Sequence, residues 1–232
     1  MELLANKLRP KNIKEIIGQQ HLVGDNKVIS NLVKNGKIFS MILYGKPGIG
    51  KTSIASAIIN ELNIRNKFLN ATTNNKADFD IAIEEAKMYG ELILVVDEIH
   101  RMNKDKQDIL LPHIESGLII LIGLTTSNPY HKINPAIRSR CAIYELKELT
   151  TEDIIIGLKR AIKELPEIKI DDESLNYIAT LSSGDFRSAI NTLETCYYST
   201  NNHEINIEAI KNVNNKPVFF HDKNEDGHYN VL

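Results

Sequence analysis

The feature that most constrains this chain is an eight-residue segment, residues 45–52 (GKPGIGKT), which fits the pattern G-x-x-x-x-G-K-[ST]. The apolar run MILY stands directly before it, at residues 41–44, and apolar residues follow at helical spacing from 54 to 62. A buried strand, a glycine-rich turn and a helix form the setting in which this pattern binds phosphate groups. The segment therefore predicts a phosphate-binding loop (P-loop) within an α/β fold.

The residue types in this loop each have a physical task. Glycines let backbone N–H groups turn toward phosphates, and the following helix N-terminus adds a positive dipole. Lys51 is expected to reach the β- and γ-phosphates of a nucleotide, and the Thr52 hydroxyl to ligate Mg²⁺. We therefore expect ATP and Mg²⁺ as cofactors. The predicted nucleotide contacts in this region are Gly45, Lys46, Pro47, Gly48, Ile49, Gly50, Lys51, Thr52 and Ser53.

Strand-like and helix-like segments alternate through the first two thirds of the chain, which predicts a parallel sheet flanked by helices. After residue 149 the strand signal disappears and three helical patterns follow. We expect a P-loop domain over residues 1–149, a small all-α lid domain over 150–213 and a tail over 214–232. The predicted strands cover residues 41–44, 67–71, 92–96, 118–124 and 142–146, and the predicted helices include 78–88, 104–114, 151–162, 172–181 and 187–198.

Polar side chains follow the predicted strands, at the sheet edge where open α/β folds bind ligands. Asp97 and Glu98 end the strand that begins at residue 92. Asp97 is expected to hold Mg²⁺ through water, and Glu98 to orient and deprotonate the attacking water. After the next strand, Thr126 or Asn128 is expected to align that water, although Asn128 before Pro129 is also typical of a turn.

Composition excludes several classes of protein. The chain is 42% hydrophobic and 25% charged, as in globular proteins, and its apolar runs are too short to cross a membrane. A net charge of −2 excludes a uniformly basic DNA-binding face, so any DNA contact is expected to be local. Cys141 and Cys196 fit no metal or disulfide pattern and are interpreted as packing residues. With no secretory signal at the N-terminus, we expect a cytoplasmic location.

Several stretches together resemble the AAA+ ATPases of the replication-associated recombination protein A family. Besides the P-loop they are DEIHR (residues 97–101), the run from Asn103 to Gly117, TTSNP (125–129) and SRC (139–141). Near the N-terminus, LRP (8–10) and IGQQHL (17–22) are similar to the family's adenine-pocket segment, and GDFR (184–187) to its sensor-2 motif. The resemblance covers nearly the whole chain. It adds Leu8, Arg9, Pro10, Ile17, Gly18 and Arg187 to the expected nucleotide contacts.

The resemblance also implies a function and partners. It implies ATP hydrolysis that remodels DNA or protein–DNA complexes at stalled replication forks, in a cytoplasmic, nucleoid-associated protein. DNA, as single strands or duplex ends, and single-stranded DNA-binding protein are the implied partners, with Arg101, Lys104 and Lys106 as candidate DNA contacts. Arg140 is expected to act on a neighbouring subunit's ATP and Arg187 to contact the γ-phosphate from the lid. His100 and His113 are interpreted as structural.

Two departures from the family pattern stand out. Ile49 replaces the common threonine, a change expected to leave the loop intact because this position contributes mainly its N–H. The chain stops where the family continues into a helical tetramerisation domain, so we expect an ATPase core with weak activity, mostly monomeric in this form although the full-length protein is a homo-oligomer. The alternatives are a clamp-loader-like or Holliday-junction-motor-like subunit and a nucleotide-gated binding module with negligible turnover.

Overall fold

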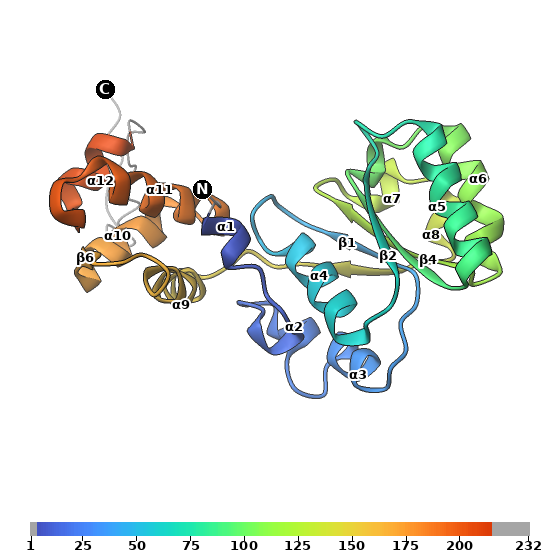
Figure 1. The fold of residues 1–232 in the computed structure, drawn as a ribbon, viewed down its shortest axis with the longest axis horizontal. Coiled ribbons are helices and arrows are strands. Elements are labelled where there is room, and N and C mark those ends of the chain that lie inside the picture. Colours follow the sequence, from blue (N-terminus) through green and yellow to red (C-terminus); the bar gives the residue numbers. More distant parts are fainter. Residues whose placement is uncertain (1–3, 215–232) are drawn as a thin grey trace, which may run out of the picture.

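Five parallel strands form the central sheet of the computed structural model, which describes residues 4–214 (Figure 1). The strand order is β2-β3-β4-β1-β5, so β4 lies between β3 and β1. This arrangement confirms the predicted α/β class and places the ends of β1, β3 and β4 next to one another. The strands are β1 (Met41–Tyr44), β2 (Asn66–Asn70), β3 (Leu92–Asp97), β4 (Ile119–Thr125) and β5 (Ala142–Glu145).

Helices cover both faces of the sheet, because successive strand residues point to opposite faces and both sets are apolar. Leu43 belongs to a core that includes α3 and α4, whereas its neighbour Ile42 belongs to a second core with α5 and α6. The helices of this part are α1 (Leu4–Lys7), α2 (Gln20–Val23), α3 (Val28–Lys34), α4 (Lys51–Leu62), α5 (Lys76–Tyr89), α6 (Lys104–Glu115), α7 (Pro129–Lys132) and α8 (Pro135–Arg138), with 3-10 turns η1 (Ile13–Glu15) and η2 (Ile99–Arg101).

The C-terminal part is helical, as predicted. Its first helix begins with a capping box in which Thr150 and Asp153 satisfy each other's backbone N–H groups. A two-stranded parallel pair, β6 with β7, is an addition that the sequence did not predict, since two-residue strands carry no readable alternation. The elements are α9 (Thr151–Ile162), β6 (Lys169–Ile170), α10 (Asp172–Leu181), α11 (Phe186–Ser199), η3 (Asn201–His203), β7 (Glu204–Ile205) and α12 (Ile207–Val213).

The N-terminal segment joins the two parts of the fold. Helix α1 lies against α11, where the backbone N–H of Leu4 donates to Glu194 Oε1 at 3.1 Å (Figure 1). Farther along, the Arg160 guanidinium of α9 donates to the Glu15 carbonyl at 2.5 Å. The predicted division at residue 150 stays a prediction, and apart from Asn214 the predicted tail lies outside the described residues. Within residues 4–214, no helix has the length and apolar character that crossing a membrane demands.

Gly123 determines how the turn after β3 packs. It lies in β4, and a Cβ added to it would come within 2.7 Å of Ile99 Cδ1. Ile99 is 2% exposed and follows Asp97 and Glu98 directly, so its anchorage in the core fixes the turn that carries both carboxylates. A small residue at position 123 is therefore a requirement of the site as well as of the core.

We expect Gly123→Ala to lower the free energy of unfolding by about 1–3 kcal/mol through overpacking. Ile99→Val removes the colliding Cδ1 atom and by itself costs about 0.5–1.5 kcal/mol. The double variant should lose less stability than the sum of the two, measured by urea unfolding. Additive losses would show that the two side chains do not compete for this space.

Candidate nucleotide-binding site

The P-loop connects β1 to α4 through three glycines in left-handed conformations. The φ angles of Gly45, Gly48 and Gly50 are +147°, +70° and +106°. Helix α4 begins at Lys51 with no capping side chain, so the N–H groups of its first turn are available to an anion. The Lys51 ammonium, half-buried, donates to the carbonyls of Gly45 at 2.7 Å and Lys46 at 2.6 Å. This loop has the geometry that a nucleotide's phosphates require.

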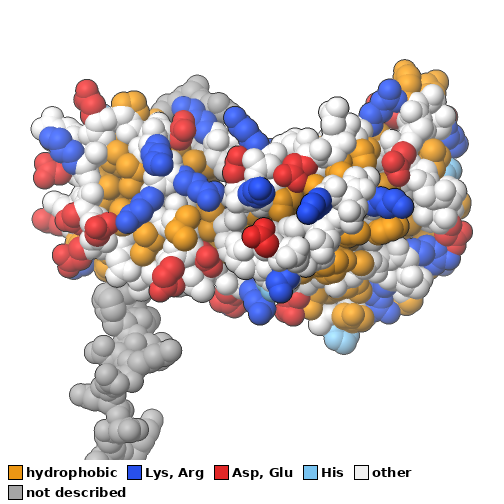
Figure 2. All heavy atoms as spheres, turned by 90° about the horizontal axis from the view of Figure 1, so that it is seen from below, with side chains coloured by type: hydrophobic (Ala, Val, Ile, Leu, Met, Phe, Trp, Pro, Cys, Tyr) orange, Lys and Arg blue, Asp and Glu red, His pale blue; other side chains and the backbone are white. Residues whose placement is uncertain are grey.

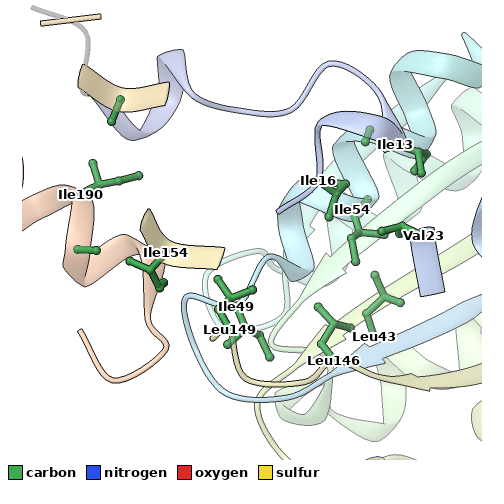
Figure 3. Packing of buried hydrophobic residues seen from close by; sticks show 14 of the residues in the cluster. Ile13, Ile16, Val23, Leu43, Ile49, Ile54, Leu146, Leu149, Ile154 and Ile190 are labelled. Carbon is green, nitrogen blue, oxygen red and sulfur yellow. The ribbon is translucent and has the colours of Figure 1, made fainter. Parts of the chain in front are cut away.

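The side chain of Ile49 anchors the P-loop from below. The Ile49 side chain is 2% exposed. It lies beside Leu149 and near Leu146, two residues of the linker that follows β5 (Figure 3). A Cβ on Gly45 would come within 2.6 Å of Ile49 Cδ1, so the loop closes tightly over this side chain. Sequence reasoning assigned the position only a backbone role. The structure adds an apolar contact that the pattern of the loop does not reveal.

The two carboxylates lie where β3 ends, beside the P-loop lysine. Asp97 Oδ1 accepts the backbone N–H of Glu98 at 2.9 Å, and Glu98 has a left-handed backbone with φ of +51°. Burial lowers the pKa of Lys51, and the nearby charges of Asp97 and Glu98 oppose this shift. The structure therefore brings together the predicted phosphate-binding lysine and the predicted metal-binding and water-activating carboxylates.

The residues after β4 lie near the start of the P-loop. Thr126 is exposed and, with Asn128, lines a cleft of about 530 Å³ that also includes Gly45 and Lys46. Asn128 Oδ1 accepts the backbone N–H of Tyr130 at 2.9 Å and caps α7. Because the Asn128 oxygen already serves the turn, Thr126 is the better candidate for contacting a water or phosphate.

The lid contacts the P-loop directly. The backbone N–H of Phe186 donates to the Gly48 carbonyl at 3.1 Å, and a Cβ on Gly48 would collide with the Asp185 carboxylate. Arg187 follows in the first turn of α11, exposed, with its positive charge close enough to lower the pKa of Lys51. Asp185, for which the sequence predicted no role, is thus a lid residue whose carboxylate lies against the phosphate-binding loop.

The predicted adenine-pocket residues divide into two groups. Ile17 and Gly18 meet the start of the lid, because a Cβ on Gly18 would come within 2.5 Å of Leu149 Cδ2, and Ile17 Cδ1 lies 2.8 Å from where a Cβ on Gly157 would be. Leu8 and Pro10 are half-buried and Arg9 is exposed, on the segment that follows α1.

Gln19 is a residue that sequence reasoning missed. Its side chain is buried, and its amide nitrogen donates to the carbonyls of Ile49 at 3.2 Å and Lys147 at 2.7 Å, while its oxygen accepts the Lys147 N–H at 2.9 Å. The amide thereby ties the N-terminal segment, the P-loop and the lid linker together. Its only sequence signal is a polar residue within the adenine-pocket segment.

The predicted trans-acting arginine is held by its own subunit. The exposed Arg140 forms an ion pair with Glu115 of α6, and it donates to the Ala136 carbonyl at 2.7 Å and to Ser139 Oγ at 3.1 Å. A surface ion pair of this kind contributes little stability. For Arg140 to reach a neighbouring subunit's nucleotide, only weak surface interactions must therefore be broken.

The three candidate DNA-contacting cations differ in exposure. Arg101 and Lys104 are exposed beside the turn after the carboxylates. Lys106 instead donates to the carbonyls of Ala71 at 3.1 Å and Asn74 at 2.5 Å, so its ammonium holds the loop between β2 and α5. On the face shown in Figure 2, basic and acidic side chains are interspersed over both lobes.

Comparison with known proteins places this geometry in a class. The model of the Holliday junction DNA helicase RuvB P-loop domain matches residues 8–137, and an AAA C-terminal domain model matches residues 163–232. The solved structure of the Thermotoga maritima RuvB Holliday junction branch migration motor superposes with a TM-score of 0.74 at 26% identity, covering 88% of this chain and 71% of that chain. Fold and site together define a P-loop ATPase of the AAA+ class.

Relatives in sequence narrow the class to a family. Replication-associated recombination protein A of Bacillus subtilis is 49% identical over 100% of this chain and 58% of its own length. The Escherichia coli protein of the same name is 42% identical over 82% of this chain and 45% of its own length. The chain belongs to the replication-associated recombination protein A family and spans about half the length of these relatives. The resemblance predicted from the motifs is thus confirmed.

We expect Arg187→Ala to reduce the difference in thermal stabilisation between ATP and ADP, because Arg187, whose charge lies near Lys51, is expected to contact the γ-phosphate. A ligand at a hundredfold excess over its Kd stabilises by about 2.7 kcal/mol. The shifts are best measured in a Glu98→Gln background, where ATP hydrolysis is expected to be slow. Lys159→Ala, an exposed cation elsewhere on the lid, is the matched control. Unchanged ATP and ADP shifts in Arg187→Ala would contradict a sensor role.

Proposed function

We propose that this chain hydrolyses ATP to ADP and phosphate where the P-loop, the end of β3 and the start of α11 lie close together. The observation that carries the proposal is the convergence of Lys51, at an uncapped helix N-terminus, with the half-buried Asp97 and Glu98. Phosphoryl transfer needs positioning and charge stabilisation, and these groups supply both. Of the other expected nucleotide contacts, Arg187 carries its charge near Lys51, and Gly18 lies against Leu149 just before the lid.

Each side chain has one task in the proposed reaction. Lys51 exchanges its bonds to loop carbonyls for the β- and γ-phosphates, and Glu98 accepts a proton as water attacks the γ-phosphorus and the bond to ADP breaks. Thr126 orients this water or the γ-phosphate. Thr52 and Asp97 are the residues that would hold Mg²⁺, whose charge neutralises phosphate oxygens. Such a site needs few protein ligands because the phosphates provide others.

We further propose that ATP hydrolysis acts on DNA or protein–DNA complexes at stalled replication forks, in the cytoplasm and in association with the nucleoid. Support comes from the family relatives, whose name refers to replication and recombination. Arg101 and Lys104 are exposed and follow Asp97 and Glu98 by a few residues, and they are the proposed contacts to single strands or duplex ends. Single-stranded DNA-binding protein is a proposed protein partner.

Two substitutions test the reaction. Lys51→Ala should abolish tight ATP binding, because the phosphates lose their P-loop cation, whereas Glu98→Gln should preserve binding and reduce turnover by about 10²–10⁴-fold. Titration with fluorescent ATP and phosphate release, each with and without single-stranded DNA, separate the two effects. Lys87→Ala, a surface cation on α5, is the control. Tight binding without turnover in the wild type would favour a nucleotide-gated binding module.

Arg140 is proposed to complete the ATP site of a neighbouring subunit in a homo-oligomer, a contribution of about 10³–10⁵ in rate for arginine fingers in general. ATPase activity per molecule should then rise with protein concentration, from a low value for a mostly monomeric chain. Arg140→Ala should remove the rise and leave ATP affinity unchanged. Glu115→Gln, which releases Arg140 from its ion pair, should preserve the rise in activity with protein concentration. Oligomeric state is measured by sedimentation velocity and ATPase activity is measured in parallel, over a hundredfold range of protein concentration. High ATPase activity of the monomer would refute the action of Arg140 on a neighbouring subunit.

A further inference from the structure

His100 lies between the end of β4, where it hydrogen-bonds Thr125, and the carboxylate of Glu98. His100 Nδ1 lies 2.9 Å from Thr125 Oγ1 and 3.3 Å from Glu98 Oε2. Thr125 is 1% exposed, and the side chains of His100 and Glu98 are 13% and 32% exposed. The contact therefore runs from the buried Thr125 to the partly exposed Glu98, between the ends of the neighbouring strands β3 and β4.

The other partners of Thr125 indicate which group donates in its hydrogen bond with His100. Thr125 Oγ1 accepts the backbone N–H of Ser127 at 3.0 Å and lies 3.4 Å from the Ser127 carbonyl, to which its hydroxyl can donate. A lone pair on His100 Nδ1 would face the negative Glu98 carboxylate, which is unfavourable. We therefore expect the proton on Nδ1, from which it donates to Thr125 Oγ1 and lies beside the Glu98 carboxylate.

Backbone geometry makes such support necessary. Glu98 has a left-handed backbone and starts a single 3-10 turn, so its side chain leaves the sheet without a helix or strand to orient it. Ile99 fixes the backbone from the core side, as described above, but it does not reach the carboxylate. His100, one residue farther along the same turn, returns to contact Glu98 from the side of β4.

We infer that His100 is a positioning residue for Glu98, and that Thr125 anchors it. This inference rests on the proposed role of Glu98 as the base in ATP hydrolysis. The imidazole holds one carboxylate oxygen, which leaves the other to accept the proton of the attacking water. Because Thr125 precedes Thr126 directly, the same strand end holds both the candidate sensor and the support of the base.

The expected consequence is a loss of turnover with retained nucleotide binding. Displacing a catalytic group by about 1 Å costs on the order of 10²-fold in rate, so His100→Ala should lower kcat by roughly 10- to 100-fold with KM for ATP and the Kd for nucleotide nearly unchanged. Thr125→Val, which loses the hydroxyl at constant shape, should show a similar but smaller loss. Thr125→Ser, which retains the hydroxyl, should restore activity. His113→Ala on α6 is the matched histidine control.

The test combines steady-state and single-turnover ATPase measurements with thermal unfolding of each variant. In the Glu98→Gln background, His100→Ala should cause less than about a twofold further loss, because the group that it positions is already disabled. Nitrogen-15 spectra of the histidine ring give a readout independent of activity and should show the proton on Nδ1 in the wild type.

The inference would be overturned by a His100→Ala kcat within twofold of wild type, by equal activity of Thr125→Ser and Thr125→Val, or by losses that multiply fully with Glu98→Gln. A rise in KM or Kd that accounts for the whole effect would also overturn it. Failure of the proposed function would instead appear in the wild type, as an absence of ATP hydrolysis.

Discussion

Parallel pairing of β4 with both β1 and β3 is the constraint on which the site depends. Tyr44 pairs with Thr125 and Val96 with Gly123, and the Gly45 N–H continues the ladder to the Thr125 carbonyl at 3.2 Å. Since all three strands run in one direction, the P-loop, the carboxylates and the polar residues after β4 leave the sheet at one edge. Segments that lie far apart in the sequence, between residues 45 and 128, thus meet at one edge of the sheet.

The sequence predicted the elements well because each is marked by local chemistry. Buried strands read as apolar runs, and the glycines of residues 45–50 mark a turn that needs positive φ. The proposed roles of Lys51, Asp97 and Glu98 follow from residue type at a glycine-rich turn and at a strand end, and the structure places the three residues together. Strand order was not predictable, because every βα unit has the same pattern whichever neighbours it pairs with.

Contacts between distant segments account for what the sequence did not reveal. Gln19 satisfies groups on Ile49 and Lys147, and no periodicity distinguishes such a buried amide from an exposed one. Lys106 reads as a surface cation, yet its ammonium bonds two carbonyls of a loop more than 30 residues away. His100 was interpreted as structural, a reading that its contact with Glu98 extends. In each case the partner lies on another element, and its identity depends on the folded arrangement.

Gly48 shows how the lid and the phosphate loop constrain each other. Its carbonyl accepts the Phe186 N–H, and the space that a side chain would occupy is filled by the Asp185 carboxylate. The same carboxylate caps α11 by accepting the Ser188 N–H at 3.0 Å, so the lid contributes a negative group beside the predicted phosphate-binding loop. The Phe186 ring lies against Gly157, so the start of α11 contacts both the phosphate-binding loop and α9. Gly48 is thus part of the phosphate-binding loop and of its contact with the lid, and a larger residue at this position would disturb both.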